Sequence, residues 1–113
     1  MQEYQLENVV NRHSAKPKDF WIPNKEHLER IEVGDFTQMI FIPKEEGLIS
    51  ERMWVEVNSI ENINGERIYH GTLNNIPYNL NMKLGDEVTF KDENIMNMMY
   101  EKNGELAFNI FGD

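Results

Sequence analysis

An Asn-Gly dipeptide at residues 64 and 65 separates two runs that are rich in β-branched and aromatic residues. Asn-Gly readily supplies the two positive φ angles of a type I′ turn, and this turn matches the twist of two antiparallel strands. The sequence therefore predicts a hairpin in which residues 59–63 pair with residues 67–73. The middle of the chain is thereby committed to antiparallel β-structure.

The segment 52–57, just before this hairpin, alternates between apolar residues and residues that are polar or aromatic. Alternation with a period of two is typical of a half-buried strand. One face then carries Met53, Val55 and Val57, and the other carries Arg52, Trp54 and Glu56.

Three more segments are predicted as strands because each follows a turn signal and has a β-rich composition. Residues 36–42 follow Gly34-Asp35, and residues 87–90 follow a similar Gly85-Asp86 pair. Residues 106–111 follow a second Asn-Gly, at 103 and 104.

Helices are predicted near the N-terminus and after residue 92. Leu6, Val9, Val10 and His13 recur with the period of one helix face, which predicts a helix over 3–14. Residues 20–23 end in proline and are expected to lie across the core as an extended strap. Asn24 is expected to cap a short helix over 25–31, and Asp92 a helix running through Ile95 and Met96.

A chain of 113 residues fits one domain. Short strands with little room for crossover helices favour an antiparallel sheet. We therefore expect an α+β fold: a small, strongly curved antiparallel sheet, an SH3-like barrel or half-barrel, with one or two N-terminal helices packed on it. Residues 1–113 form the single domain, divided into an N-terminal helix and linker (1–19) and a β-rich body (20–113).

Composition limits the choice of partner. The chain has 20 acidic and 11 basic residues, a net charge of −9, so it lacks the cationic surface with which proteins bind nucleic acids or anionic membranes. It has no cysteine, which excludes thiolate metal sites and disulfides. With no leader sequence and no apolar run of about 20 residues, a cytoplasmic location is expected.

Trp54, between Arg52 and Glu56 on one strand face, is the first candidate for binding, because Trp and Arg are common at interface hot spots. The alternative is that the N-terminal helix or the strap covers this face and makes Trp54 part of the core. A different reading is enzymatic: Glu51 or Glu56 acts beside Arg52 in a pocket rimmed by Trp54 and Tyr69.

Other catalytic or metal chemistry finds little support in the sequence. His13, His27 and His70 have no metal-ligand spacing and are expected to be structural. The serines lack a nucleophile-elbow motif, and no phosphate-binding loop is present. We therefore expect no catalytic residue, metal or cofactor.

Three stretches, 51–57, 71–77 and 84–90, resemble the bacterial family known as domain of unknown function 2314. The resemblance directs attention to its motif positions, which in this chain are Glu51, Arg52, Trp54, Glu56, Gly71, Asn75 and Pro77. It implies no activity, cofactor or catalytic residue, and its association with accessory bacterial genes favours a role in conflict or defence. The expected function is a non-enzymatic protein-binding module, such as an immunity or inhibitor protein, that acts on a basic protein. Binding residues would be Glu51, Arg52, Trp54, Glu56, Tyr69 and Asn75, and a sheet edge leaves a homodimer open.

Overall fold

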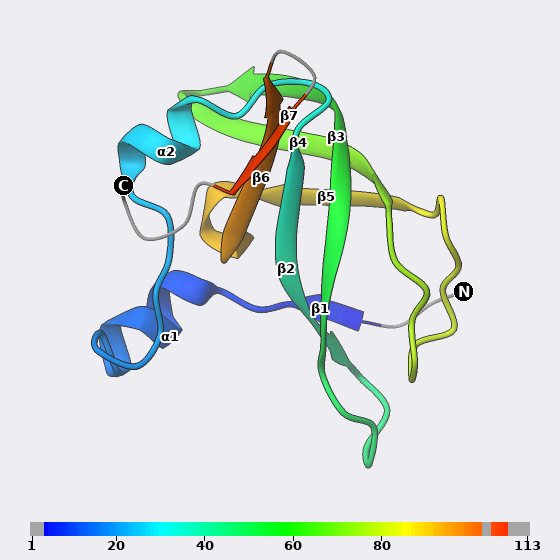
Figure 1. Ribbon diagram of the computed structural model, residues 1–113. Helices are drawn as coiled ribbons and strands as arrows, with labels where there is room; N and C mark the ends of the chain where they lie inside the picture. The colour runs from blue at the N-terminus through cyan, green and yellow to red at the C-terminus, as the bar shows by residue number, and fades with distance from the viewer. Residues whose placement is uncertain (1–3, 103–104, 109–113) are drawn as a thin grey trace.

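One antiparallel sheet organises the computed structural model, which describes residues 4–102 and 105–108. Its strands in these residues are β1 (Tyr4–Leu6), β2 (Phe36–Pro43), β3 (Glu51–Ile63), β4 (Glu66–Leu73), β5 (Glu87–Lys91), β6 (Asn97–Lys102) and β7 (Glu105–Phe108). The strand order is β5-β4-β3-β2-β6-β7, and β1 also pairs with β2. The sheet curls until β5 runs across the direction of β2 (Figure 1). This half-barrel with two short helices confirms the predicted α+β class.

The central hairpin forms as predicted. Asn64 and Gly65 have φ angles of 54° and 82°, as a type I′ turn requires. The strands before and after this turn, β3 and β4, pair with each other. The two predicted segments 52–57 and 59–63 are one strand, β3. A β-bulge between Val57 and Ser59 lets the strand bend without ending.

The alternation in β3 decides which side chains enter the core. Met53, Val55 and Val57 are each at most 2% exposed and lie on the inner face of the sheet. They join residues from neighbouring strands in one apolar cluster, which includes Met39, Phe41, Tyr69, Leu73, Val88 and Phe90. The other side of β3, which we call the outer face, carries Arg52, Trp54 and Glu56.

Gly71 allows β4 to approach β3 closely beside the bulge. A Cβ atom at this position would collide with the carbonyl oxygen of Glu56 and would lie 2.6 Å from Cγ1 of Val55. Both contacts are far shorter than van der Waals distance, so glycine is a requirement of strand packing here.

The two Gly-Asp turns, at 34–35 and 85–86, make the same set of hydrogen bonds. In each turn, the Asp N–H donates to the carbonyl oxygen of the residue three positions earlier. The Asp carboxylate accepts from the N–H of that same residue. In each, the Gly N–H and the Asp carbonyl pair with one residue of a neighbouring strand of the sheet, Val57 of β3 for the first turn and Leu73 of β4 for the second, all at 2.8 Å. The similarity of the two sequences thus reflects one local structure used twice.

The predicted helix over 3–14 is wrong in its first half. Residues Tyr4–Leu6 form β1, paired with β2, and the helix α1 is Val9–Ala15. The side chains of Tyr4 and Leu6 lie on the same face of β1 and pack against the core. The side chain of Asn8 caps α1 by accepting from the N–H of Asn11. The sheet therefore begins within the segment 1–19 that was assigned to a helix and linker.

The strap over 20–23 packs on the outer face of β2 at the end near α1. Phe20 is buried in a second small apolar cluster with Val9 and Ile40. His13 binds the carbonyl oxygen of Phe20 through Nδ1 at 2.7 Å, so Nδ1 carries the proton. The strap is thereby fixed to α1, and this histidine is structural.

The second helix, α2 (Lys25–Glu29), begins as predicted, with the Asn24 side chain accepting from the N–H of His27 at 2.9 Å. It ends two residues before the predicted end. Arg67 of β4 donates to the carbonyl oxygens of Leu28 and Ile31 at 2.9 and 2.7 Å. This cation holds the end of α2 to the sheet.

The predicted helix after Asp92 is also wrong beyond its first turn. A 3-10 turn, η1 (Asp92–Asn94), has Lys91 rather than Asp92 in its N-cap position, and β6 follows after Ile95 and Met96. The N–H of Met96 donates to the carbonyl of Gln38, so pairing with β2 replaces the helical bonds. Part of the predicted last strand is β7, whereas Asn103-Gly104 and residues 109–111 lie outside the described residues.

Candidate functional site

The outer face of β3 places three of the candidate residues in a row along the strand. Arg52 is exposed, whereas Trp54 and Glu56 are half-buried. The guanidinium of Arg52 lies 6.0 Å from the centre of the Phe20 ring, so the strap reaches the Arg52 end of this row. Trp54 therefore lies between the two predicted environments, neither inside the main core nor fully in solvent.

Asn75 holds the backbone of Trp54 from the loop that follows β4. Its Oδ1 accepts from the Trp54 N–H, and the N–H of Asn74 donates to the Trp54 carbonyl at 2.8 Å. Strand β4 ends at Leu73, opposite Val55, so without these bonds the start of β3 would have a free edge on this side. The loop takes the place of the missing strand.

Glu51 holds the same loop at a second place. Its carboxylate accepts from the N–H groups of Tyr78 and Asn79 at 2.6 Å and of Leu80 at 3.0 Å. Burial raises the pKa of Glu51, but the three backbone donors together outweigh it and the pKa falls below its ordinary value. The side chain of Asn79 also donates to the carbonyl of Ile49, so a hydrogen bond connects the β4–β5 loop to the β2–β3 loop.

These contacts bear on the enzymatic reading of the same residues. A carboxylate whose pKa is lowered by three N–H donors is a poor proton donor near neutral pH. Tyr69 is 0% exposed, stacks on Phe90 inside the core and donates to Asp92, so it lies on the inner face and rims no pocket with Trp54. Burial raises its pKa, and the hydrogen bond to Asp92 raises it further.

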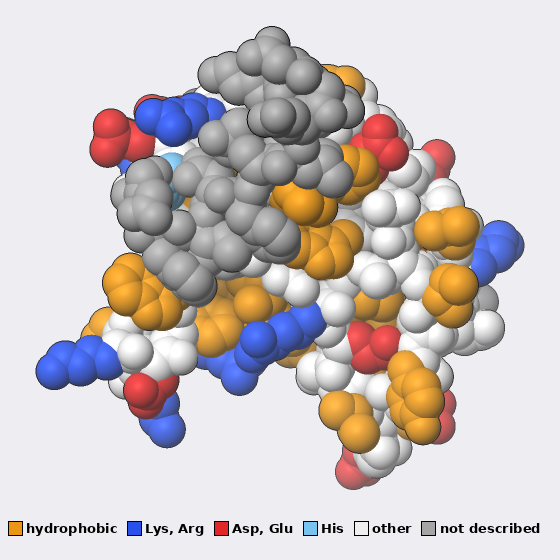
Figure 2. All heavy atoms as spheres, in the orientation of Figure 1, with side chains coloured by type: hydrophobic (Ala, Val, Ile, Leu, Met, Phe, Trp, Pro, Cys, Tyr) orange, Lys and Arg blue, Asp and Glu red, His pale blue; other side chains and the backbone are white. Residues whose placement is uncertain are grey.

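The loops held by Glu51 and Asn75 expose large apolar side chains. Ile49 is 68% exposed, Ile76 84% and Tyr78 88%. We call these three residues the loop patch. Figure 2 shows hydrophobic side chains gathered at the lower right, where the β2–β3 and β4–β5 loops lie. Sequence analysis did not identify these residues as candidates, although apolar side chains around Asn75 and Pro77 in a polar loop were a usable signal.

Acidic and hydroxyl side chains continue the outer face beyond Trp54. Glu56 pairs across the sheet with Thr72, and Thr72 with Glu87. Two residues further from Leu73 along β4, Ser59 of β3 pairs with His70, and His70 pairs with Thr89 of β5. Nε2 of His70 lies 2.6 Å from Oε1 of Glu61, the distance of an N–H donor to a carboxylate.

Metal binding and membrane crossing can both be assessed on the described residues. Within them, no group of three or more His, Asp or Glu side chains is arranged to hold a metal ion. Also within them, no helix has both the length and the apolar character needed to cross a bilayer.

Comparison with known proteins gives a family assignment. Residues 6–109 match the model of the family described as "Uncharacterized protein conserved in bacteria (DUF2314)". The chain belongs to this family. Searches of curated proteins and of solved structures gave no match. For this member of the DUF2314 family, function must therefore be argued from its own residues, and three of the motif positions, Glu51, Trp54 and Asn75, meet at the loop contacts described above.

Proposed function

We propose that this protein is a non-enzymatic binding module that docks a basic protein through the loop patch, with Trp54 beside it. The observation that carries the proposal is the combination of an 88% exposed Tyr78 with a loop backbone held by the Glu51 carboxylate. A rigid loop that displays apolar side chains loses little conformational entropy on binding. Tyr is also one of the residue types that most often dominate binding energy.

The charge of the chain supports a basic partner. At −9, its field attracts a cationic protein and speeds the encounter, and salt weakens the attraction. Glu56, Glu61 and Glu87 place part of this charge on the outer face, and Glu56 lies two residues from Trp54. An immunity or inhibitor protein that neutralises a basic toxin in the bacterial cytoplasm is the type of function that this surface fits.

The proposal predicts loss of the partner on truncation of the loop patch. We expect a double variant, Ile76→Ala with Tyr78→Ala, to weaken binding by about 2 kcal/mol or more, because truncated hot-spot residues cost this much. The measurement is affinity capture from the native lysate, read by mass spectrometry, followed by titration of the purified partner by calorimetry at low and high salt.

Ile63→Ala provides a matched control. Ile63 is 50% exposed at the far end of the β3–β4 hairpin, so its truncation removes similar apolar surface away from the loop patch. The control should bind as the natural chain does. Equal binding by the double variant, with its fold intact by circular dichroism, would contradict the proposed docking surface, and an affinity that rises with salt would contradict the basic partner.

A further inference from the structure

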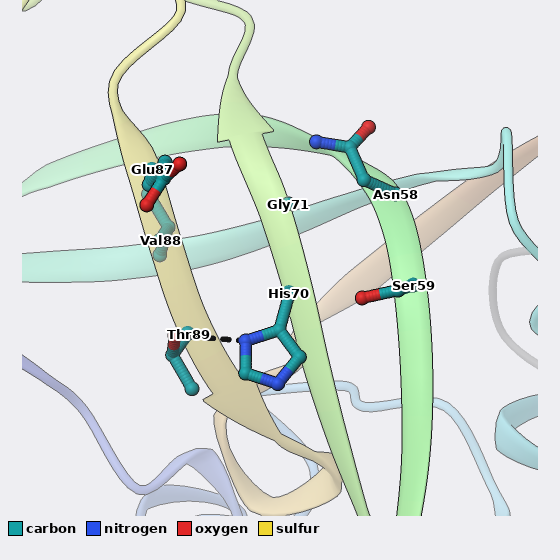
Figure 3. A pocket seen from close by; sticks show the side chains of 7 residues that line it. All are labelled: Asn58, Ser59, His70, Gly71, Glu87, Val88 and Thr89. Atoms are coloured by element: carbon teal, nitrogen blue, oxygen red, sulfur yellow. Dashed lines mark hydrogen bonds between the residues drawn. The ribbon is translucent and has the colours of Figure 1, made fainter.

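A hollow of about 330 Å³ opens on the outer face where β3, β4 and β5 run side by side. Its rim is formed by Asn58, Ser59, His70, Glu87, Val88 and Thr89. Gly71 lies between Asn58 and Glu87 and contributes no side chain, so the backbone of β4 forms the floor (Figure 3). The bulge in β3 turns both Asn58 and Ser59 toward this side.

The polar atoms around this hollow are mostly hydrogen-bond acceptors. In the tautomer with the proton on Nε2, His70 donates to Glu61 and its Nδ1 is an acceptor. Oγ1 of Thr89 lies 3.2 Å from Nδ1 and donates to it in that tautomer, which leaves the lone pairs of the Thr89 hydroxyl available. Glu87 adds a carboxylate and Ser59 a hydroxyl oxygen, whereas Asn58 turns its amide nitrogen toward Gly71 (Figure 3).

The charge at the rim is negative. Among the described residues, the ion pairs of arginine and lysine join Arg12 to Glu7 and Lys91 to Glu66. Glu87 takes part in neither of them and is exposed. The hollow thus combines an unneutralised carboxylate on β5 with the hydroxyl oxygens of Thr89 on β5 and Ser59 on β3.

We propose that this hollow is a binding subsite for an arginine side chain, an inference that rests on the proposed function because the arginine belongs to the basic partner. A guanidinium is planar, carries five donors and forms paired hydrogen bonds with a carboxylate. Acceptors on β3 and β5, on the two sides of β4, suit several donors in one plane better than the single point charge of lysine. The loop patch would then supply apolar contact, and the hollow would fix the register of the partner.

The subsite can be tested without the partner. The ¹⁵N-labelled protein is titrated with Nα-acetyl-arginine amide and, separately, with the neutral isostere Nα-acetyl-citrulline amide, and amide chemical shifts are followed. We expect millimolar binding of the arginine compound alone, with the largest shifts at residues 58–59, 70–71 and 87–89. In Glu87→Gln, binding should weaken about tenfold, because a charge-assisted hydrogen bond is lost.

Glu45→Gln is the control for net charge. It removes one acidic charge from the exposed β2–β3 loop, away from the hollow, and should leave arginine binding unchanged. Equal shifts with arginine and citrulline, shifts scattered over the acidic surface, or equal weakening by both variants would each overturn the subsite. If the partner still needs Tyr78 while free arginine ignores the hollow, only the subsite fails. If arginine binds but the loop-patch variant keeps its partner, the proposed docking surface fails instead.

Discussion

Gly71→Ala is expected to destabilise the protein by about 3 kcal/mol, at the upper end of what overpacking of an interior costs. The new Cβ would collide with the Glu56 carbonyl and approach Cγ1 of Val55 to 2.6 Å. Backbone at a strand pairing cannot move as a flexible side chain can, so β4 must separate from β3. Unfolding in urea, followed by circular dichroism, measures the loss.

Thr72→Ala is the control for this prediction. Thr72 is the next residue of β4, but its side chain is half-buried on the outer face. Its loss should cost less than about 1 kcal/mol. Similar stability of the two variants would show that β4 does not approach β3 as closely as the structure indicates.

The parts of the fold that sequence patterns predicted are those set by local chemistry. Asn64-Gly65 fixes the hairpin because its φ angles suit one turn type, and alternation in β3 fixes which face is buried. Asn24 caps α2 for a similarly local reason. These patterns need no knowledge of which strands become neighbours.

The failures occurred where tertiary pairing overrode a local pattern. Leu6 fits a helix period together with Val9, but β2 has an edge that β1 can pair with, and the core has room for the side chains of Tyr4 and Leu6. The residues after Asp92 were likewise drawn into β6 by pairing with β2. Strand partners far away in sequence decided both outcomes.

The site was predicted in part for the same reason. Alternation placed Trp54 and Glu56 on the outer face, but it could not show that Tyr69, on another strand, faces the core. The contacts of Glu51 and Asn75 span 21 to 29 residues of sequence, so only the fold reveals them. They indicate why these two residue types occur at the motif positions.

Glu51→Gln is expected to lower stability at pH 7 by about 1–2 kcal/mol, since a neutral amide replaces a carboxylate that accepts from three N–H groups. The amide keeps one oxygen acceptor and places two donors against the remaining N–H groups. The loop should therefore loosen before the sheet does. Hydrogen exchange at Tyr78, Asn79 and Leu80 should become faster than in the natural chain.

The effect should depend on pH in a known direction. The pKa of Glu51 is lower in the folded state than its ordinary value of 4.5, so its stabilisation is fully present above 4.5. It is lost as the pH falls through the folded-state pKa, because the carboxylate is then protonated in both states. The difference in unfolding free energy between the natural chain and Glu51→Gln should thus be largest near pH 7 and shrink toward zero in acid.

Glu46→Gln, in the exposed β2–β3 loop, carries the same charge change and controls for the general effect of net charge. Its stability difference from the natural chain should stay small at every pH. If the Glu51 difference persists unchanged in acid, or if Glu46→Gln reproduces it, the three hydrogen bonds do not hold the loop. The exposed Tyr78 would then lack the fixed backbone on which docking by the loop patch depends.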